Sequence, residues 1–144
     1  MSDNGGGKGK SGIGVYALSD IHLDNEGNKP WFKKLLKDNY ADDTLILAGD
    51  VSDDLGLLRE TLTALRGLFK EVFFVPGNHE LWINRSDCDD SLKKFWQIID
   101  LCNSLNVNTR PAKIGGGENG NGVWILPLFS WYRKPEESDK SLYY

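Results

Sequence analysis

The chain has 144 residues, a formal net charge of −4, two His and two Cys, with 40% hydrophobic and 26% charged residues. This length fits one domain, and no apolar run reaches the roughly 18 residues of a membrane span. The acidic balance, without a basic cluster, disfavours general nucleic-acid binding. Two Cys are too few for a disulfide framework, and the N-terminal residues lack the apolar stretch of a signal peptide. We therefore expect a cytoplasmic protein with no membrane partner.

The first twelve residues differ in composition from the rest of the chain. Residues 1–12 are rich in Gly and polar side chains, which predicts a disordered leader before a single domain at 13–144. Gly9, Lys10 and Ser11 resemble the end of a phosphate-binding P-loop. However, Asn4 stands where that pattern needs Gly, and no strand precedes it, so we reject a P-loop.

Short apolar runs alternate with helical patterns along the domain. The runs that predict strands are residues 13–19, 44–48, 72–75 and 123–126. The Gly-rich segment 115–122 before the last run predicts a loop or hairpin turn. Because the first three runs are continuously apolar, they predict a parallel α/β sheet covered on both faces.

Three helices are expected between these strands. The first has Pro30 in its first turn and the apolar stripe Trp31, Phe32, Leu35 and Leu36. The second begins near Asp53 and Asp54 and carries Leu58, Leu62, Leu65 and Phe69 on one face. The third has Ser91 as a possible cap and the apolar positions Leu92, Phe95, Trp96, Ile99 and Cys102. We expect the Leu stripes, Trp31 and Trp96 to lie in the core.

A polar cluster follows each of the first three predicted strands, at 19–22, 49–53 and 76–80. Parallel sheets bind ligands beyond the carboxyl ends of their strands, where these clusters should converge. In extended backbone Asp20 and His22 point the same way, and Gly49 lets backbone approach closely before Asp50. Carboxylate, imidazole and amide oxygens suit Mn, Fe, Zn or Mg, and a carboxylate between two ions fits a two-metal hydrolytic site. Each cluster alone could be a turn or a cap, but three at successive strand ends favour a site.

The motifs Asp-x-His, Gly-Asp-x-x-Asp and Gly-Asn-His-Glu occur in this order within residues 13–82. They resemble the calcineurin-like metallophosphoesterases. The resemblance implies a four-layer αββα sandwich, here truncated to its N-terminal part. It also implies hydrolysis of a phosphomonoester or phosphodiester by a metal-bound hydroxide.

The resemblance also assigns roles to particular residues. Asp20 and His22 would ligate the first metal, Asp50 would bridge both metals, and Asn78 would ligate the second. His79 would face the phosphate as the general acid, oriented by Asp53.

The family's pattern continues with further His residues, whereas this sequence has none after His79. The first metal would keep Asp20, His22 and Asp50, while the second would keep only Asp50 and Asn78. Three protein ligands make a workable site, so we expect at most one well-bound ion and weak or absent phosphoesterase activity. The alternative is a non-catalytic remnant with a binding role or none, and a nuclease is disfavoured by the acidic balance.

Two aromatic features are interpreted with the same family plan. Residues 124–132 are strongly apolar and would be core or pocket wall in a whole sandwich. In a truncated chain we expect this segment to be exposed, which favours a homo-oligomer formed through the uncovered sheet. Trp82, close behind His79, could equally be a pocket wall or a packing residue.

Overall fold

The computed structural model describes residues 12–83, 88–116 and 121–130. Its elements in chain order are β1 (Val15–Leu18), α1 (Lys29–Leu35), β2 (Tyr40–Ala48), α2 (Leu55–Leu68), β3 (Phe69–Val75), the 3-10 helix η1 (His79–Leu81), α3 (Ser91–Ser104), β4 (Ala112–Gly115) and β5 (Gly122–Ile125). The predicted leader up to residue 11, with Gly9, Lys10 and Ser11, lies outside the described residues. No helix in the described ranges is long and apolar enough to cross a membrane.

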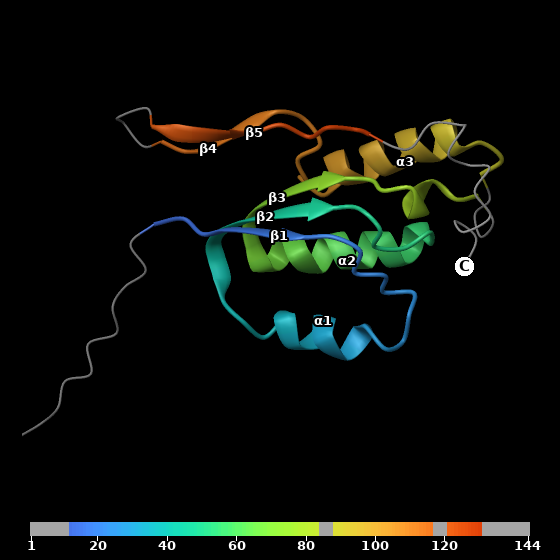
Figure 1. Ribbon diagram of the computed structural model, residues 1–144, viewed down its shortest axis with the longest axis horizontal. Coiled ribbons are helices and arrows are strands. Elements are labelled where there is room, and N and C mark those ends of the chain that lie inside the picture. The colour runs from blue at the N-terminus through green and yellow to red at the C-terminus, as the bar shows by residue number, and fades with distance from the viewer. Residues whose placement is uncertain (1–11, 84–87, 117–120, 131–144) are drawn as a thin grey trace, which may run out of the picture.

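The three predicted parallel strands form one sheet in the order β1-β2-β3. Helices α1 and α2 lie on one side of this sheet, and α3 lies on the other (Figure 1). This arrangement confirms the predicted α/β class. Beyond β3, Asn108 adds a single parallel bridge to Phe73, with backbone bonds from Asn108 N to Val72 O and from Phe74 N to Asn108 O.

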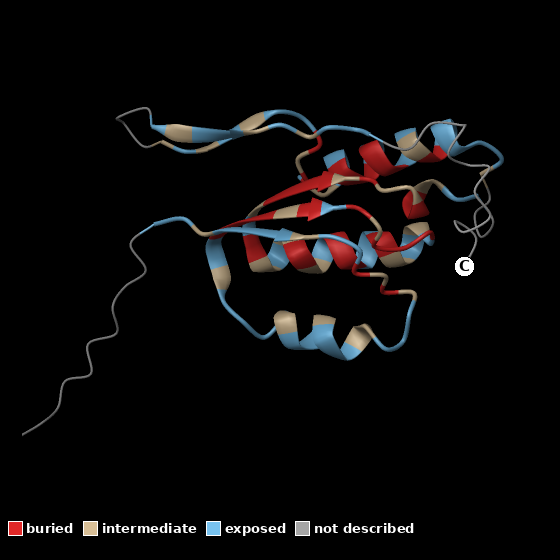
Figure 2. Ribbon diagram, viewed as in Figure 1, coloured by how far each residue is buried: buried red, intermediate tan, exposed pale blue. Residues whose placement is uncertain are grey.

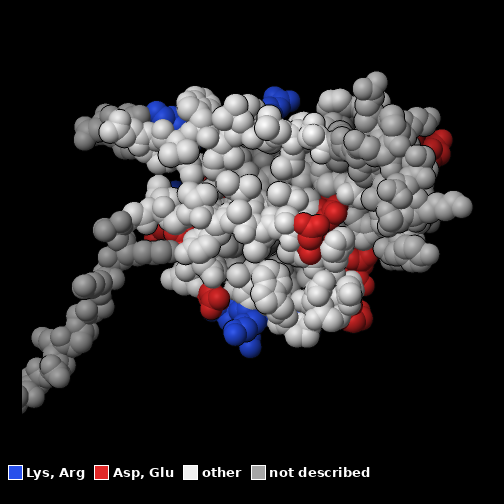
Figure 3. All heavy atoms as spheres, in the orientation of Figure 1, with Lys and Arg blue, Asp and Glu red and all other residues white. Residues whose placement is uncertain are grey.

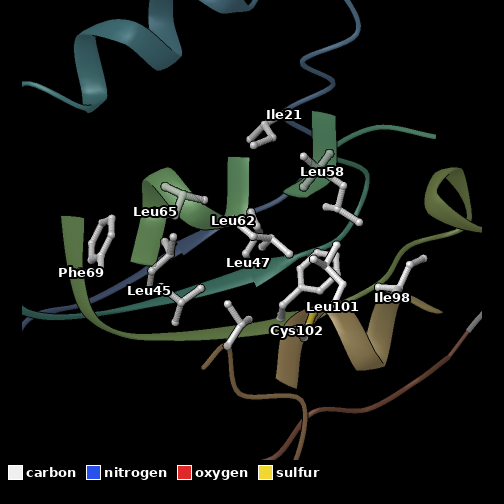
Figure 4. Packing of buried hydrophobic residues seen from close by; sticks show 14 of the residues in the cluster. Ile21, Leu45, Leu47, Leu58, Leu62, Leu65, Phe69, Ile98, Leu101 and Cys102 are labelled. Carbon is white, nitrogen blue, oxygen red and sulfur yellow. The ribbon is translucent and has the colours of Figure 1, made fainter. Parts of the chain in front are cut away.

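The core lies between the sheet and the helices on its two sides (Figure 4). Leu45 and Leu47 of β2 and Phe74 of β3 are completely buried. Helix α2 contributes the predicted Leu stripe, and α3 contributes a second apolar face. The helix residues in this cluster are Leu58, Leu62, Leu65, Ile98, Leu101 and Cys102.

Strand β1 is more exposed than expected (Figure 2), and so are the predicted core tryptophans Trp31 and Trp96. Val15 keeps 51% of its surface exposed because β1 is an edge strand in the described sheet. Trp31 and Trp96 are 45% and 57% exposed, so the prediction that they lie in the core was wrong. Helix α1 has no buried residue, and the buried face of α3 contains Ile98 and Leu101 rather than Trp96.

Two predicted helix boundaries were also wrong. Helix α2 ends at Leu68, and Phe69 turns into extended backbone to begin β3. There its ring stacks on Tyr40 with centroids 4.7 Å apart, which explains why a residue in helical register leaves the helix. Asp90, not Ser91, caps α3 by accepting a hydrogen bond from Lys93 N. The Ser91 hydroxyl instead donates to Leu81 O at 2.8 Å.

The last predicted strand forms a hairpin rather than joining the parallel sheet. Strands β4 and β5 pair antiparallel, as expected from the Gly-rich turn between them. Several apolar residues in and after β5 are exposed: Trp124 is 60% and Leu128 79% exposed. Trp131 and Tyr132, the end of the predicted aromatic segment, lie outside the described residues.

Self-association through this exposed segment stays a prediction. We expect sedimentation velocity to show a concentration-dependent oligomer, because burying such apolar side chains on association is favourable. Leu128→Ser should shift the equilibrium towards monomer, while Leu92→Ser, on the exposed side of α3, should not. A monomer at every concentration would contradict the prediction.

The two thiols should differ in reactivity because they differ in burial. Cys102 is completely buried, and burial raises the pKa of its thiol to about 12, whereas Cys88 is half-buried. The thiolate is the reactive form, so a disulfide reagent at about pH 8 should label only Cys88 in the folded chain. Labelling of Cys102 should require denaturant. Cys88→Ser provides the control, and rapid native labelling of that variant would contradict the expectation.

Candidate active site

The loops after β1 and β2 are held side by side by backbone hydrogen bonds that continue the strand pairing. Asp20 N donates to Gly49 O at 3.1 Å, and His22 N donates to Asp50 O at 3.0 Å. Leu23 N then donates to Val51 O at 2.8 Å. Two of the three predicted polar clusters are therefore brought together along their length, as their positions at neighbouring strand ends predicted.

The loop after β3 approaches these loops at two glycines. A Cβ on Gly49 would come within 2.4 Å of Gly77 N, and a Cβ on Gly77 would come within 2.2 Å of Asp50 Oδ1. Gly49 also has a φ of +69°, which favours glycine. These glycines let backbone pack against backbone, so that His79 N donates to Asp50 Oδ1 at 3.0 Å.

Asp20, His22 and Asp50 form a compact set of possible metal ligands. One ligand atom from each lies within 4.8 Å of the other two. The set combines two carboxylates with one imidazole, a donor set that suits a divalent ion of the Mg, Mn, Fe or Zn group. The residues therefore fit a single metal position.

The backbone reasoning that predicted this pair of ligands was wrong in detail. Asp20 and His22 do not lie in extended backbone, because their φ angles are +53° and +37°. Asp50 has a φ of +54° as well. Non-glycine residues in this region cost about 1–3 kcal/mol each, and they persist only where the surrounding structure holds them. The loop-to-loop hydrogen bonds supply that support.

Glu80 holds the loops after β2 and β3 in place, and its role was not predicted from the sequence. Its completely buried carboxylate accepts hydrogen bonds from four backbone N–H groups. One oxygen accepts from Asp50 and Gly77, at 2.9 and 2.7 Å. The other accepts from Val51 and Ser52, at 2.5 and 3.1 Å. A buried charge requires such partners, so Glu80 and the two loops depend on each other.

His79 is buried against three other side chains of the site, those of His22, Asp24 and Trp82. Its Nδ1 lies 3.2 Å from His22 Nδ1, and its Nε2 lies 4.0 Å from Asp24 Oδ2. Trp82 meets the ring edge-on, with centroids 4.1 Å apart at 89°. Trp82 was left open as a pocket wall or a packing residue. In the structure its ring contacts the ring of the proposed catalytic histidine.

The predicted pairing of Asp53 with His79 stays a prediction. A carboxylate that was not predicted, Asp24, lies beside this ring, with its Oδ2 4.0 Å from His79 Nε2. Asp53 is buried, and its backbone carbonyl accepts from Lys94 Nζ at 2.6 Å. Lys94 also donates to Trp82 O, so this buried lysine joins the loop after β2 to the segment after η1. Burial lowers the pKa of Lys94, while the nearby Asp53 and Glu80 carboxylates act in the opposite direction.

Asn78 lies between Gly77 and His79, directly before η1. Its backbone carbonyl accepts from Leu81 N at 3.1 Å. Its side chain is half-buried and makes no capping bond to η1. The assignment of Asn78 to a second metal stays a prediction.

A shallow cavity of about 260 Å³ opens beside Asp20. Its lining residues are Leu18, Ser19, Asp20, Ile21, Asn28 and Trp31. Figure 3 shows several acidic side chains over the end of the molecule to which the strands point, while the Lys and Arg side chains visible in that view lie elsewhere.

Three site residues were missed in the sequence, although each left a signal. Asp24 stands two positions after His22, and Glu80 completes the motif that begins at Gly77. Lys94 lies four residues before Ile98, on the buried face of α3. A charge inside an apolar helical stripe was the available sign that this lysine is buried and bonded.

Comparisons with known proteins agree with this geometry. Residues 13–134 match the family model described as calcineurin-like phosphoesterase. Over 134 residues the chain is 34% identical to the [acyl-carrier-protein] phosphodiesterase PptH of Mycobacterium tuberculosis, covering 88% of this chain and 41% of that protein. The crystal structure of the phosphopantetheinyl hydrolase PptH from Mycobacterium tuberculosis superposes with a TM-score of 0.67 at 31% identity, covering 81% of this chain and 42% of that one. The chain thus spans about two fifths of the length of these relatives.

Glu80→Gln should destabilise the fold, because an amide cannot accept from four N–H groups and its own NH₂ would face donors. We expect a loss of about 2–3 kcal/mol in the free energy of unfolding, measured by urea denaturation. Glu60→Gln, on the exposed side of α2, is the matched control and should change little. Equal stability of the two variants would contradict the role assigned to Glu80.

Proposed function

Because the chain belongs to the calcineurin-like phosphoesterase family, we propose that it carries the first metal position of a metal-dependent phosphoesterase site. The convergence of Asp20, His22 and Asp50 within 4.8 Å carries this proposal. With His79 bonded to Asp50 through its backbone N–H, one set of loops holds both the ligands and the candidate acid.

The ligands proposed for the first ion are Asp20, His22 and Asp50, with Mn, Fe, Zn or Mg as candidates. A bound divalent ion would lower the pKa of a coordinated water and offset phosphate charge. For the second ion of a dinuclear centre, the proposed ligands are Asp50 and Asn78. Since two protein ligands hold an ion weakly, we propose that this chain binds one metal well and that its hydrolytic activity is weak or absent.

His79 is proposed as the group that stabilises or protonates the leaving oxygen of the ester. Its ring is fixed by Trp82 on one side and by His22 on another, which limits the directions in which it can donate. The orienting role of Asp53 remains part of the proposal, carried by the family motif. Asp24 Oδ2 lies 4.0 Å from Nε2 of the His79 ring, so Asp24 is a second candidate for that role.

The proposed substrate is a phosphate ester, and a phosphodiester is favoured over a phosphomonoester. The support is the relative named as an acyl-carrier-protein phosphodiesterase. The cavity beside Asp20, with the exposed face of Trp31, offers a place for the organic part of such an ester. A cytoplasmic location is proposed on the sequence features alone.

A second candidate is a non-catalytic, metal-binding or partner-binding chain. The observation that favours it is the count of two His in the sequence, both of which already lie in the described site. In that case the chain would still bind a metal ion at the first position, but the metal-bound chain would not hydrolyse phosphate esters.

Asp50→Asn should abolish both metal uptake and any hydrolysis, because it removes a charged ligand from the first position. Elemental analysis after loading with Mn²⁺ measures uptake, and an aryl phosphodiester and an aryl phosphomonoester report activity. Asp42→Asn, at an exposed position of β2, is the matched control. Unchanged metal content in Asp50→Asn would remove the basis of the proposal.

His79→Ala should separate binding from chemistry in the same Mn²⁺-loaded assays. It should keep the metal, because His79 is not a ligand of the first position. Its turnover should fall about 10²–10⁴-fold, the range typical for a lost acid–base group. Metal binding without turnover in the unmodified chain would favour the second candidate.

A further inference from the structure

The described side chains contain a second set of possible metal ligands that the family motif does not assign. His22, Asp24 and His79 each offer one ligand atom, and these three atoms lie within 4.8 Å of one another. His22 belongs to this set and also to the set with Asp20 and Asp50. The two sets are therefore adjacent and share one imidazole.

The geometry of the two imidazoles suits coordination to one small ion. Their Nδ1 atoms are 3.2 Å apart. Two ligand atoms on a tetrahedral ion with bonds of about 2.0–2.1 Å lie about 3.3 Å apart. The His79 side chain is only 11% exposed and is held by Trp82, so its ring is already fixed. Asp24 is 20% exposed, and its Oδ2 lies 4.0 Å from Nε2 of the His79 ring.

The two sets differ in the ions they should prefer. Two imidazoles and one carboxylate form a nitrogen-rich set, of the composition found in catalytic zinc sites with three protein ligands. Two carboxylates and one imidazole form an oxygen-rich set that suits harder ions such as Mg²⁺. We propose that Zn²⁺ binds to this chain at His22, Asp24 and His79, in preference to the position made by Asp20, His22 and Asp50.

Zinc at this position would be coordinated by a ring nitrogen of His79, the proposed general acid. Zn²⁺ would then suppress any hydrolysis supported by Mn²⁺, a consequence that rests on the proposed function. The binding itself requires no hydrolytic activity, so the two can be tested separately.

The test uses the fact that the whole chain has only two His. In a ¹⁵N-labelled sample each imidazole gives its own nitrogen signals, and coordination moves the signal of the bound nitrogen. On titration with Zn²⁺ we expect signals of both His22 and His79 to move. Titration with Mg²⁺, which is also diamagnetic, should leave the His79 nitrogens unmoved. Zinc that moves only the His22 signals would overturn the proposal.

Asp24→Asn tests the third ligand without changing the size of the side chain. It should weaken the zinc affinity reported by the His79 signals about tenfold or more, since a charged ligand is lost. Asp100→Asn, at an exposed position of α3, is the matched control and should leave the affinity unchanged. Because Asp24 is partly exposed, we expect the variant to fold, and a thermal unfolding transition would confirm this. A folded Asp24→Asn variant with unchanged zinc affinity would also overturn the proposal.

Discussion

The site depends on one buried carboxylate. Glu80 accepts hydrogen bonds from four backbone N–H groups, three in the loop after β2 and one in the loop after β3. A carboxylate buried without partners would cost several kcal/mol, so the folded state strongly favours the single arrangement that supplies all four donors. That arrangement brings the loop of Asp50 and the loop of His79 into contact. The chemistry of the site therefore depends on a residue that would not itself touch an ion or a substrate.

This anchoring explains how the ligand loops tolerate unfavourable backbone. Asp20, His22 and Asp50 all have positive φ, and Gly49 and Gly77 leave no room for side chains where the loops meet. Such conformations are stable only when contacts with neighbouring groups hold them in place. Glu80 fixes one side of the Asp50 loop, and the paired backbone of residues 20–23 fixes the other side. Strain is thus concentrated where the candidate metal ligands are presented.

The sequence predicted the parts of the molecule that follow local rules. Continuous apolar runs located β1, β2 and β3, and polar clusters at their ends located Asp20, His22, Asp50 and His79 near one point. It failed where tertiary contacts override local pattern. Phe69 leaves its helix to stack on Tyr40, and Trp96 faces outward although it continues an apolar stripe. Asp24 and Glu80 were missed because their roles come from contacts between loops, which no periodicity encodes. Lys94 was missed although a charge inside the apolar stripe of α3 was a sign of it.

Because the sequence has only two imidazoles, the two possible sets of metal ligands compete for them. His22 is common to both sets, and His79 can act either as a proton donor or as a ligand, but not through the same nitrogen at once. In a site with more imidazoles, other ligands could hold a nitrogen-seeking ion away from the acid. Here, among the described residues, both rings lie within reach of one position, and Trp82 keeps His79 there. The identity of the ion should therefore decide which role His79 has, because a hard ion leaves its ring available and a nitrogen-preferring ion engages it.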